Sequence, residues 1–121
     1  MESILTSIKK LLGIDDEYTH FDSDIIMHIN TVFMILSQIG VGPSKGFRIT
    51  GAEETWDDFI PNMEEKNLEA TKTYIYDRVR LLFDPPTGSV VMQAVKDSTN
   101  ELEWRLNIAA ESIDFDTEEE I

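Results

Sequence analysis

The chain has no cysteine. This absence excludes disulfides, thiolate metal ligands and thiol nucleophiles, and it fits a protein made in a reducing compartment. The chain also lacks a continuous apolar run near 18 residues, so we expect no membrane-spanning segment. Its N-terminal segment has a periodic apolar face instead of the continuous apolar core of a signal peptide. We therefore expect the protein to be made in the cytosol of the producing cell.

Basic residues are scarce. The sequence has 10 Lys and Arg against 24 Asp and Glu, which gives a formal net charge of −14. Direct wrapping of DNA or RNA is therefore disfavoured, because nucleic-acid affinity comes largely from cations that neutralise phosphates. Three alternatives fit a strongly negative net charge: a surface that DNA passes without binding, an acidic mimic of nucleic acid, and an ordinary acidic protein.

Residues suited to catalysis are also few. The chain has two histidines and no Gly-rich phosphate loop, so we predict no enzyme activity and no cofactor. Asp24 and His28 are four residues apart on an expected helix, with His20 and Asp22 nearby, which is a spacing that two metal ligands can use. No second histidine pair accompanies them, so we expect polar surface residues and no metal site.

The acidic run at residues 15–17 invites comparison with a calcium-binding loop, because Asp15, Glu17 and Thr19 alternate. The pattern fails in two places. His20 stands at the sixth position, where the sharp turn needs Gly, and Ile26 stands at the twelfth, where a bidentate Glu is needed. We therefore predict a solvated linker between two helices.

What the sequence does contain is helical periodicity. Its hydrophobic content of 41% is enough for one core, and 121 residues is the usual size of one domain. Apolar spacings of three and four, bounded by Gly and Pro, predict helices near residues 2–12 and 22–39, a third from about residue 62 or 64 to 83, and a fourth from between residues 87 and 89 to about 111. The last two should form an antiparallel hairpin because their connection is short. The fold class is therefore all-α, a small bundle of about four main helices spanning residues 1–111.

Residues 43–55 are the least regular part of this expected domain. Phe47 and Ile49 alternate in a short extended piece, which indicates a loop or a small hairpin on the flank of the bundle. Thr55 and Asp58 can then form a capping box, with Asp58 in place of the usual Glu. The short turn that follows carries Trp56, which should close one end of the core.

Residues 111–121 hold six acidic residues and no basic one. We predict that residues 112–121 form an acidic, flexible tail. Within it Ile113 and Phe115 alternate, so the segment could add as a strand to another protein's sheet or dock in a groove.

Several other side chains could belong to an interface. Trp104 and Ile108 lie on one stripe of the last helix, where a wide core face and a partner interface are equally good interpretations. The tyrosines and arginines of residues 74–80 could form a polar interface, although half-buried tyrosines with surface arginines are the favoured interpretation. The candidate interface residues are Phe47, Ile49, Trp56, Tyr74, Tyr76, Arg78, Arg80, Trp104, Ile108, Ile113 and Phe115.

Three segments carry a resemblance to a known family. They are KTYIYDRVRLLFDPPTGS, the following NELEWRLNIAAE, and the opening ESILTSIKKLLGIDDEYTHFDSDIIMHINTVFMILSQIGVGP. The chain resembles the head-tail connector (adaptor) proteins of tailed bacteriophages and prophages of Gram-positive bacteria, from its start to about residue 111. The resemblance implies a structural virion protein that assembles into a ring, typically of twelve copies, between the portal and the stopper. Viral DNA would pass through the lumen of that ring.

A second function class stays open beside this one. The charge also suits an acidic binding module, such as a DNA-mimic inhibitor of a basic partner. A structural connector and a mimic differ in the partner they require: portal or stopper for the first, a basic nuclease or repressor for the second.

Overall fold

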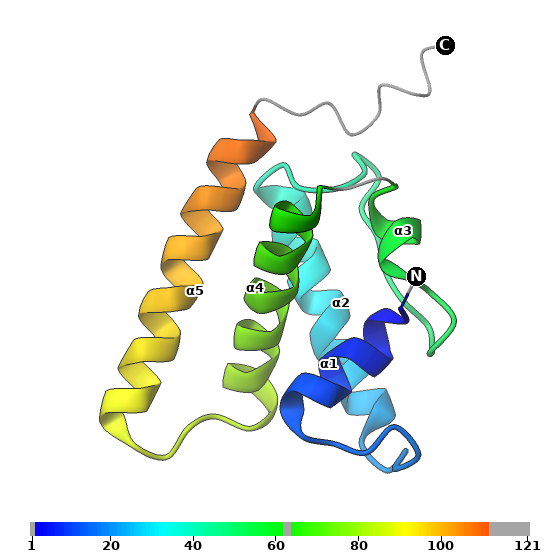
Figure 1. Ribbon diagram of the computed structural model, residues 1–121, viewed down its shortest axis with the longest axis vertical. Helices are drawn as coiled ribbons and strands as arrows, with labels where there is room; N and C mark the ends of the chain where they lie inside the picture. The colour runs from blue at the N-terminus through cyan, green and yellow to red at the C-terminus, as the bar shows by residue number, and fades with distance from the viewer. Residues whose placement is uncertain (1, 62–63, 112–121) are drawn as a thin grey trace.

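The computed structural model describes residues 2–61 and 64–111 (Figure 1). It is all-α, as predicted, with four main helices and one short one, and its described residues form no strand. Residues 43–55 therefore form a loop, and the alternative of a small hairpin is not realised. The elements are α1 (Ile4–Leu12), α2 (Asp22–Gln38), α3 (Trp56–Phe59), α4 (Glu65–Phe83) and α5 (Ser89–Ala110).

Helix α1 is a short amphipathic helix with both ends capped. The side chain of Ser3 accepts a hydrogen bond from the Thr6 amide at 3.2 Å, so the helix begins at Ile4 and not at the expected residue 2. Gly13 ends it in the left-handed conformation, at φ 80°, which glycine adopts without strain. Ile4 and Ile8 are fully buried in the core.

Helix α2 runs through the centre of the bundle (Figure 1). Apolar residues at spacings of four, three, four and three predict its inner stripe, and of these Ile25, Ile29, Val32 and Leu36 are buried, whereas Ile39, at the C-cap, is half-buried. The sequence predicts that Asp22 caps its first turn, but Phe21 stands at the N-cap and Asp22 makes no capping hydrogen bond.

The aromatic residue before α2 also packs differently from the prediction. The spacing of Phe21 and Ile26 predicts a hydrophobic staple at the start of this helix, but the Phe21 ring lies edge-on to the ring of Phe83, 5.4 Å between centroids. The start of α2 is thereby packed against the last residue of α4.

The capping box at α3 is confirmed. The Thr55 hydroxyl accepts from the Asp58 amide at 3.3 Å, and the Thr55 amide donates to the Asp58 carboxylate at 2.8 Å. The turn is tied to α1, because the Ile4 amide donates to the Glu54 carbonyl at 3.0 Å.

Helix α4 packs against three other helices, α1, α2 and α5. It forms the predicted antiparallel hairpin with α5 (Figure 1). Helical spacing predicts one inner face with Leu68, Ile75, Val79 and Leu82. Ile75 and Val79 are fully buried and Leu68 is half-buried, whereas Leu82 is 51% exposed. Leu82 is exposed because the last turn of α4 lies at the edge of the bundle.

Helix α5 flanks the bundle and is not enclosed by it. Leu106 is its one buried apolar side chain, and Val91, one of the apolar residues whose helical spacing predicts this helix, is 47% exposed. The physical reason is that only α4 makes extensive contact with this helix. Among the described residues, no helix is long and apolar enough to cross a membrane.

Candidate interaction surfaces

The loop of residues 43–49 is fixed against α2 by one side chain. The Ile49 amide donates to Asn30 Oδ1 at 2.7 Å, and Asn30 Nδ2 donates to the Ile49 carbonyl at 2.9 Å. Both backbone groups of Ile49 are therefore satisfied by α2. Phe47 packs edge-on to Phe33 at 5.2 Å between ring centroids, and its ring also contacts that of Phe59 at 5.4 Å. These contacts hold the loop of residues 43–49 in a fixed position beside α2.

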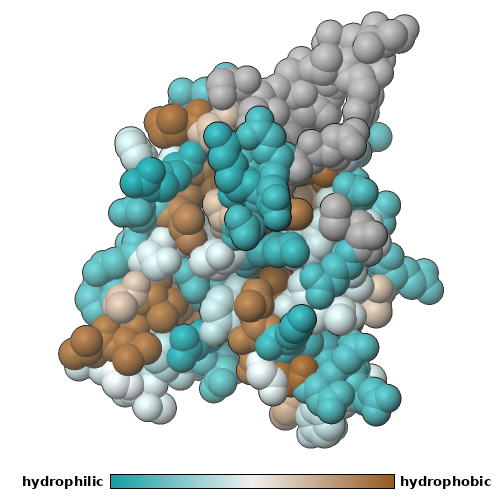
Figure 2. Space-filling model, in the orientation of Figure 1, coloured by the Kyte–Doolittle hydropathy of each residue, from teal (hydrophilic) through white to brown (hydrophobic). Residues whose placement is uncertain are grey.

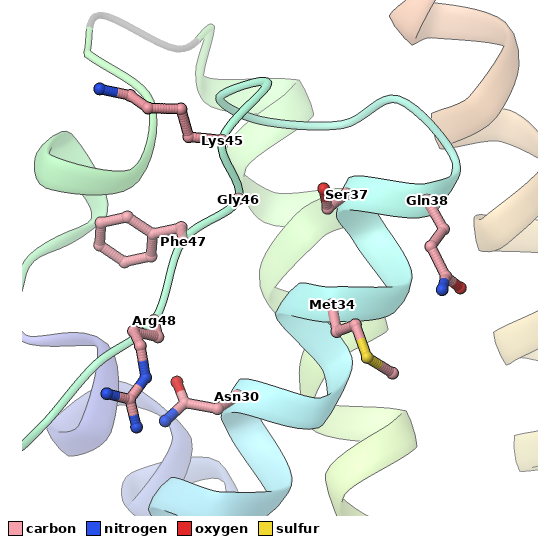
Figure 3. Close-up of a pocket in the computed structure, with 8 residues that line it drawn as sticks. All are labelled: Asn30, Met34, Ser37, Gln38, Lys45, Gly46, Phe47 and Arg48. Atoms are coloured by element: carbon pink, nitrogen blue, oxygen red, sulfur yellow. The ribbon is translucent and has the colours of Figure 1, made fainter.

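A groove of about 480 Å³ lies between this loop and α2 (Figure 3). Lys45 and Arg48 are exposed on the loop side, and Met34, which is 55% exposed, lies on the helix side. The described lining residues include two bases and no acid, in a chain of net charge −14. They are Asn30, Met34, Ser37, Gln38, Lys45, Gly46, Phe47 and Arg48.

The outer face of α5 presents apolar side chains to solvent. Trp104 is 62% exposed and Ile108 is 47% exposed, and their spacing of four places them on one face. Figure 2 shows a further apolar patch at the lower end of this helix, where Val90 is 82% exposed. Of the two interpretations of Trp104 and Ile108, the wide core face is wrong, because neither side chain is buried in the chain's own core.

Tyr74 and Arg78 lie between α4 and α5 and hold the two helices together. The Tyr74 hydroxyl donates to Glu103 Oε1 at 2.6 Å, and Arg78 Nη2 pairs with the same oxygen at 2.7 Å. Arg78 Nε also donates to the Tyr74 oxygen at 2.8 Å. Burial and the bond to Glu103 raise the pKa of Tyr74, while the bond from Tyr74, helped by Arg78, lowers the pKa of Glu103.

The two tyrosines and two arginines within residues 74–80 therefore do not form one cluster. Tyr74 and Arg78 face α5, and Tyr76 and Arg80 lie half-buried on another side of α4. Between them, Asp77 is 7% exposed and accepts from Ser98 Oγ at 2.9 Å. Burial raises the pKa of Asp77.

Trp56 is 1% exposed and belongs to the core. Its indole nitrogen donates to Ser7 Oγ at 2.9 Å, and the ammonium of Lys72 lies 5.4 Å from the ring centroid. The expectation that Trp56 closes one end of the core agrees with this placement.

The candidate interface residues thus fall into separate places. Ile49, Trp56 and Tyr74 are buried and present no surface to a partner. Phe47, Tyr76, Arg78 and Arg80 are half-buried. Trp104 and Ile108 are exposed on α5. Ile113 and Phe115, with the rest of the expected acidic tail, lie outside the described residues.

Lys9 is a buried charge that the sequence pattern did not predict. Lys9 is 1% exposed, and its ammonium contacts the carbonyls of Asp16 and Tyr18 at 3.0 and 2.9 Å and the Asp22 carboxylate at 2.9 Å. The available signal was a lysine on the apolar stripe of α1, followed by an acidic loop. The segment compared above with a calcium loop therefore wraps around the chain's own cation.

The described residues contain no group of three or more His, Asp or Glu side chains arranged to hold a metal ion. His28 lies half-buried beside the ring of Phe83, 6.3 Å between centroids. His20 packs edge-on to Phe21 at 4.8 Å. Both histidines thus contact aromatic side chains.

A second groove, of about 660 Å³, lies where the α1–α2 loop meets the end of α4. Tyr18, Phe21 and Phe83 form its apolar wall, and Asp15 and Asp84 are also among its lining residues. The two grooves differ in charge: this one is acidic and the one beside α2 is basic.

Comparison with curated proteins gives no match, and comparison with solved structures gives none either. A family model, described as phage connector protein, matches residues 4–112. The matched residues span all five helices. They therefore include the residues of the buried α4–α5 contact and those of the exposed face of α5. The chain therefore belongs to the phage connector protein family, whose members are structural components at the head-tail connection of the phage particle and not enzymes.

Proposed function

We propose that this protein forms a closed ring of twelve copies between the portal and the stopper of a phage particle, with DNA passing through the lumen. Family membership supports the connector role. The net charge of −14 supports the passage of DNA, because an acidic wall repels phosphates and gives them no cationic attachment.

The observation that carries the ring is the outer face of α5. An exposed tryptophan next to an exposed isoleucine is unusual on a monomer surface, and tryptophan is enriched at the centres of interfaces. Trp104 is 62% and Ile108 47% exposed, on a helix whose other side is held by α4. In the proposed ring this face packs laterally against a neighbouring copy.

Such a contact is heterologous: the α5 face of one copy meets a different surface of the next. A heterologous contact closes into a ring only when its rotation fits a whole number of copies. Assembly therefore depends on ring geometry as well as on the strength of one contact. We propose that the free protein is mainly monomeric and assembles on its portal.

Negative-stain microscopy tests the proposed function directly. The protein is imaged alone and mixed with the portal protein of its own phage. Rings that stack on the portal are the expected result. The absence of both rings and any portal complex would refute the proposal, and binding to a basic nuclease or repressor in their place would favour the DNA-mimic alternative.

The role of α5 is tested by the double substitution Trp104→Ala, Ile108→Ala. Because both side chains are largely exposed, the helical spectrum should not change, while ring formation on the portal should be lost. The control is Leu11→Ala on α1, which removes an apolar side chain of 48% exposure elsewhere. Equal ring yields for the two variants would exclude α5 as the lateral contact.

A further inference from the structure

The groove between α2 and the loop of residues 43–49 has two exposed cations and no acid among its described lining residues. We infer that its occupant is the chain's own acidic C-terminal segment, residues 112–121, bound in cis with Phe115 as the apolar anchor. The groove combines an apolar side chain, Met34, with two cations, Lys45 and Arg48. It therefore fits an extended segment that alternates apolar and acidic residues.

The two cations of the groove are available for a partner. Lys45 and Arg48 are exposed and form no ion pair with another described residue. In contrast, Lys9, Lys72 and Arg78 are each paired with a carboxylate. In a chain with 24 acids, two cations on one loop without an ion pair among the described residues leave local positive charge that an acidic ligand neutralises.

The C-terminal segment has the matching chemistry. It contains five acids and no base, and its apolar residues Ile113 and Phe115 are separated by Asp114. In an extended chain, residues two apart point to the same side, and the residue between them points to the other. Phe115 can therefore contact Met34 and Phe47 while the flanking carboxylates face Lys45 and Arg48.

The place where the described chain ends brings this segment close to the groove. Asn107 Nδ2 donates to the Ile39 carbonyl at 2.8 Å. In addition, a Cβ added at Gly40 would lie 3.7 Å from the Ala110 Cβ. The end of α5 thus lies against the end of α2, within one helical turn of the groove residues Ser37 and Gln38.

The segment is also long enough. The loop side of the groove lies across α2 from α5 (Figure 3), and crossing the end of a helix about 10–12 Å wide takes about four extended residues at ~3.3 Å each. Residues 112–115 make that crossing and deliver Phe115 to the groove. The remaining six residues, with the acids at 116 and 118–120, then run past the two cations.

The full-length protein offers a direct test, because it contains no cysteine. A nitroxide is attached to the single cysteine of Thr117→Cys, and paramagnetic broadening is measured on isotope-labelled backbone amides. We expect the strongest broadening at residues 45–48 and at Met34. Broadening at other surfaces alone, or at none, would overturn the inference.

Charge variants of the same labelled protein test how the segment is held. With Lys45→Gln, Arg48→Gln, the ratio of bound to free segment should fall about fivefold or more, and the broadening with it. Lys10→Gln, Lys96→Gln removes the same charge from two exposed lysines outside the groove, and should preserve the broadening. Equal loss in both double variants would mean that attraction is non-specific and would overturn the site.

The anchor and the cis arrangement have their own controls. Phe115→Ala should release the segment, whereas Ile121→Ala should not. Mixing nitroxide-labelled protein at natural isotope abundance with isotope-labelled protein that lacks the nitroxide should give no broadening at residues 45–48. Broadening in that mixture would show docking onto a second copy and would overturn binding in cis.

Discussion

The ammonium of Lys9 lies 2.9 Å from the carboxylate of Asp22, and both groups hold the loop between α1 and α2 in place. Lys9 is 1% exposed, so its charge is compensated by Asp22 and by the two loop carbonyls that it contacts. The ammonium thus donates hydrogen bonds to two loop carbonyls and forms an ion pair with the carboxylate of the first residue of α2. This pair, and not a capping hydrogen bond, is what Asp22 contributes to the start of α2.

Lys9→Met should lower the free energy of unfolding by about 2–3 kcal/mol. Removing one partner of a buried ion pair costs about 3–5 kcal/mol, and the effect is smaller here because the Asp22 side chain is 26% exposed. Urea unfolding followed by circular dichroism measures it. The adjacent, exposed Lys10→Met is the control, and equal midpoints for the two variants would contradict the structural role of Lys9.

Tyr74→Phe should destabilise the α4–α5 pair by about 1–2 kcal/mol, because Glu103 and Arg78 each lose a hydrogen-bond partner in a partly buried place. Tyr76→Phe, on the other side of α4, should change stability by less than about 0.5 kcal/mol. Thermal and urea unfolding of both variants provide the comparison. A larger loss for Tyr76→Phe would reverse this assignment of the two tyrosines.

Glu103→Gln should destabilise the protein in a pH-dependent way. The pKa of Glu103 is lower in the folded chain than its ordinary value of 4.5. A depressed carboxyl pKa adds stability that is fully present above the unfolded-state pKa and is lost as the pH falls through the folded-state pKa. The difference from the parent protein should therefore be largest near neutral pH and shrink below pH 4.5.

The control for this pH dependence is Glu101→Gln, which removes the same charge from an exposed i,i+4 pair with Arg105. Unfolding in urea is measured across a pH series for both variants. A pH-independent difference between Glu103→Gln and the parent protein would disprove the linkage.

Gly42→Ala should cost about 2–4 kcal/mol. A Cβ at this position would lie 2.6 Å from Phe59 Cε1, and the backbone φ of +97° is strained for a residue with a side chain. Gly51→Ala is the matched control, because nothing lies within 4 Å of its added Cβ. Differential scanning calorimetry should show a lower melting temperature for Gly42→Ala alone, and a similar decrease in both would argue against the contact.

The sequence was sufficient to predict the parts of the fold that depend on local pattern. The all-α class, the antiparallel pairing of α4 with α5 and the Thr55 capping box follow from periodicity, a short connection and one cap motif. The inner stripe of α2 followed in the same way, because a central helix buries whichever face carries its apolar spacing.

What the sequence did not predict depends on contacts between distant segments. The burial of Lys9 requires the position of the α1–α2 loop, and the exposure of Trp104 requires knowing that α5 is covered by α4 on one side alone. Likewise, the groove beside α2 exists because Asn30 binds both backbone groups of Ile49, 19 residues away in sequence. None of these pairings leaves a periodic signal.

The contacts that hold α5 also determine which helix of the fold unfolds locally first. This helix contributes one buried apolar side chain, Leu106, with Leu102 and Ala110 half-buried against the core, and it makes polar contacts at Ser98, Glu103 and Asn107. Segments with little buried apolar surface open at lower free energy than the rest of a domain. The amide hydrogens of α5 should therefore exchange with solvent before those of α2, so α5 is the helix that can be repositioned while the remaining core stays folded.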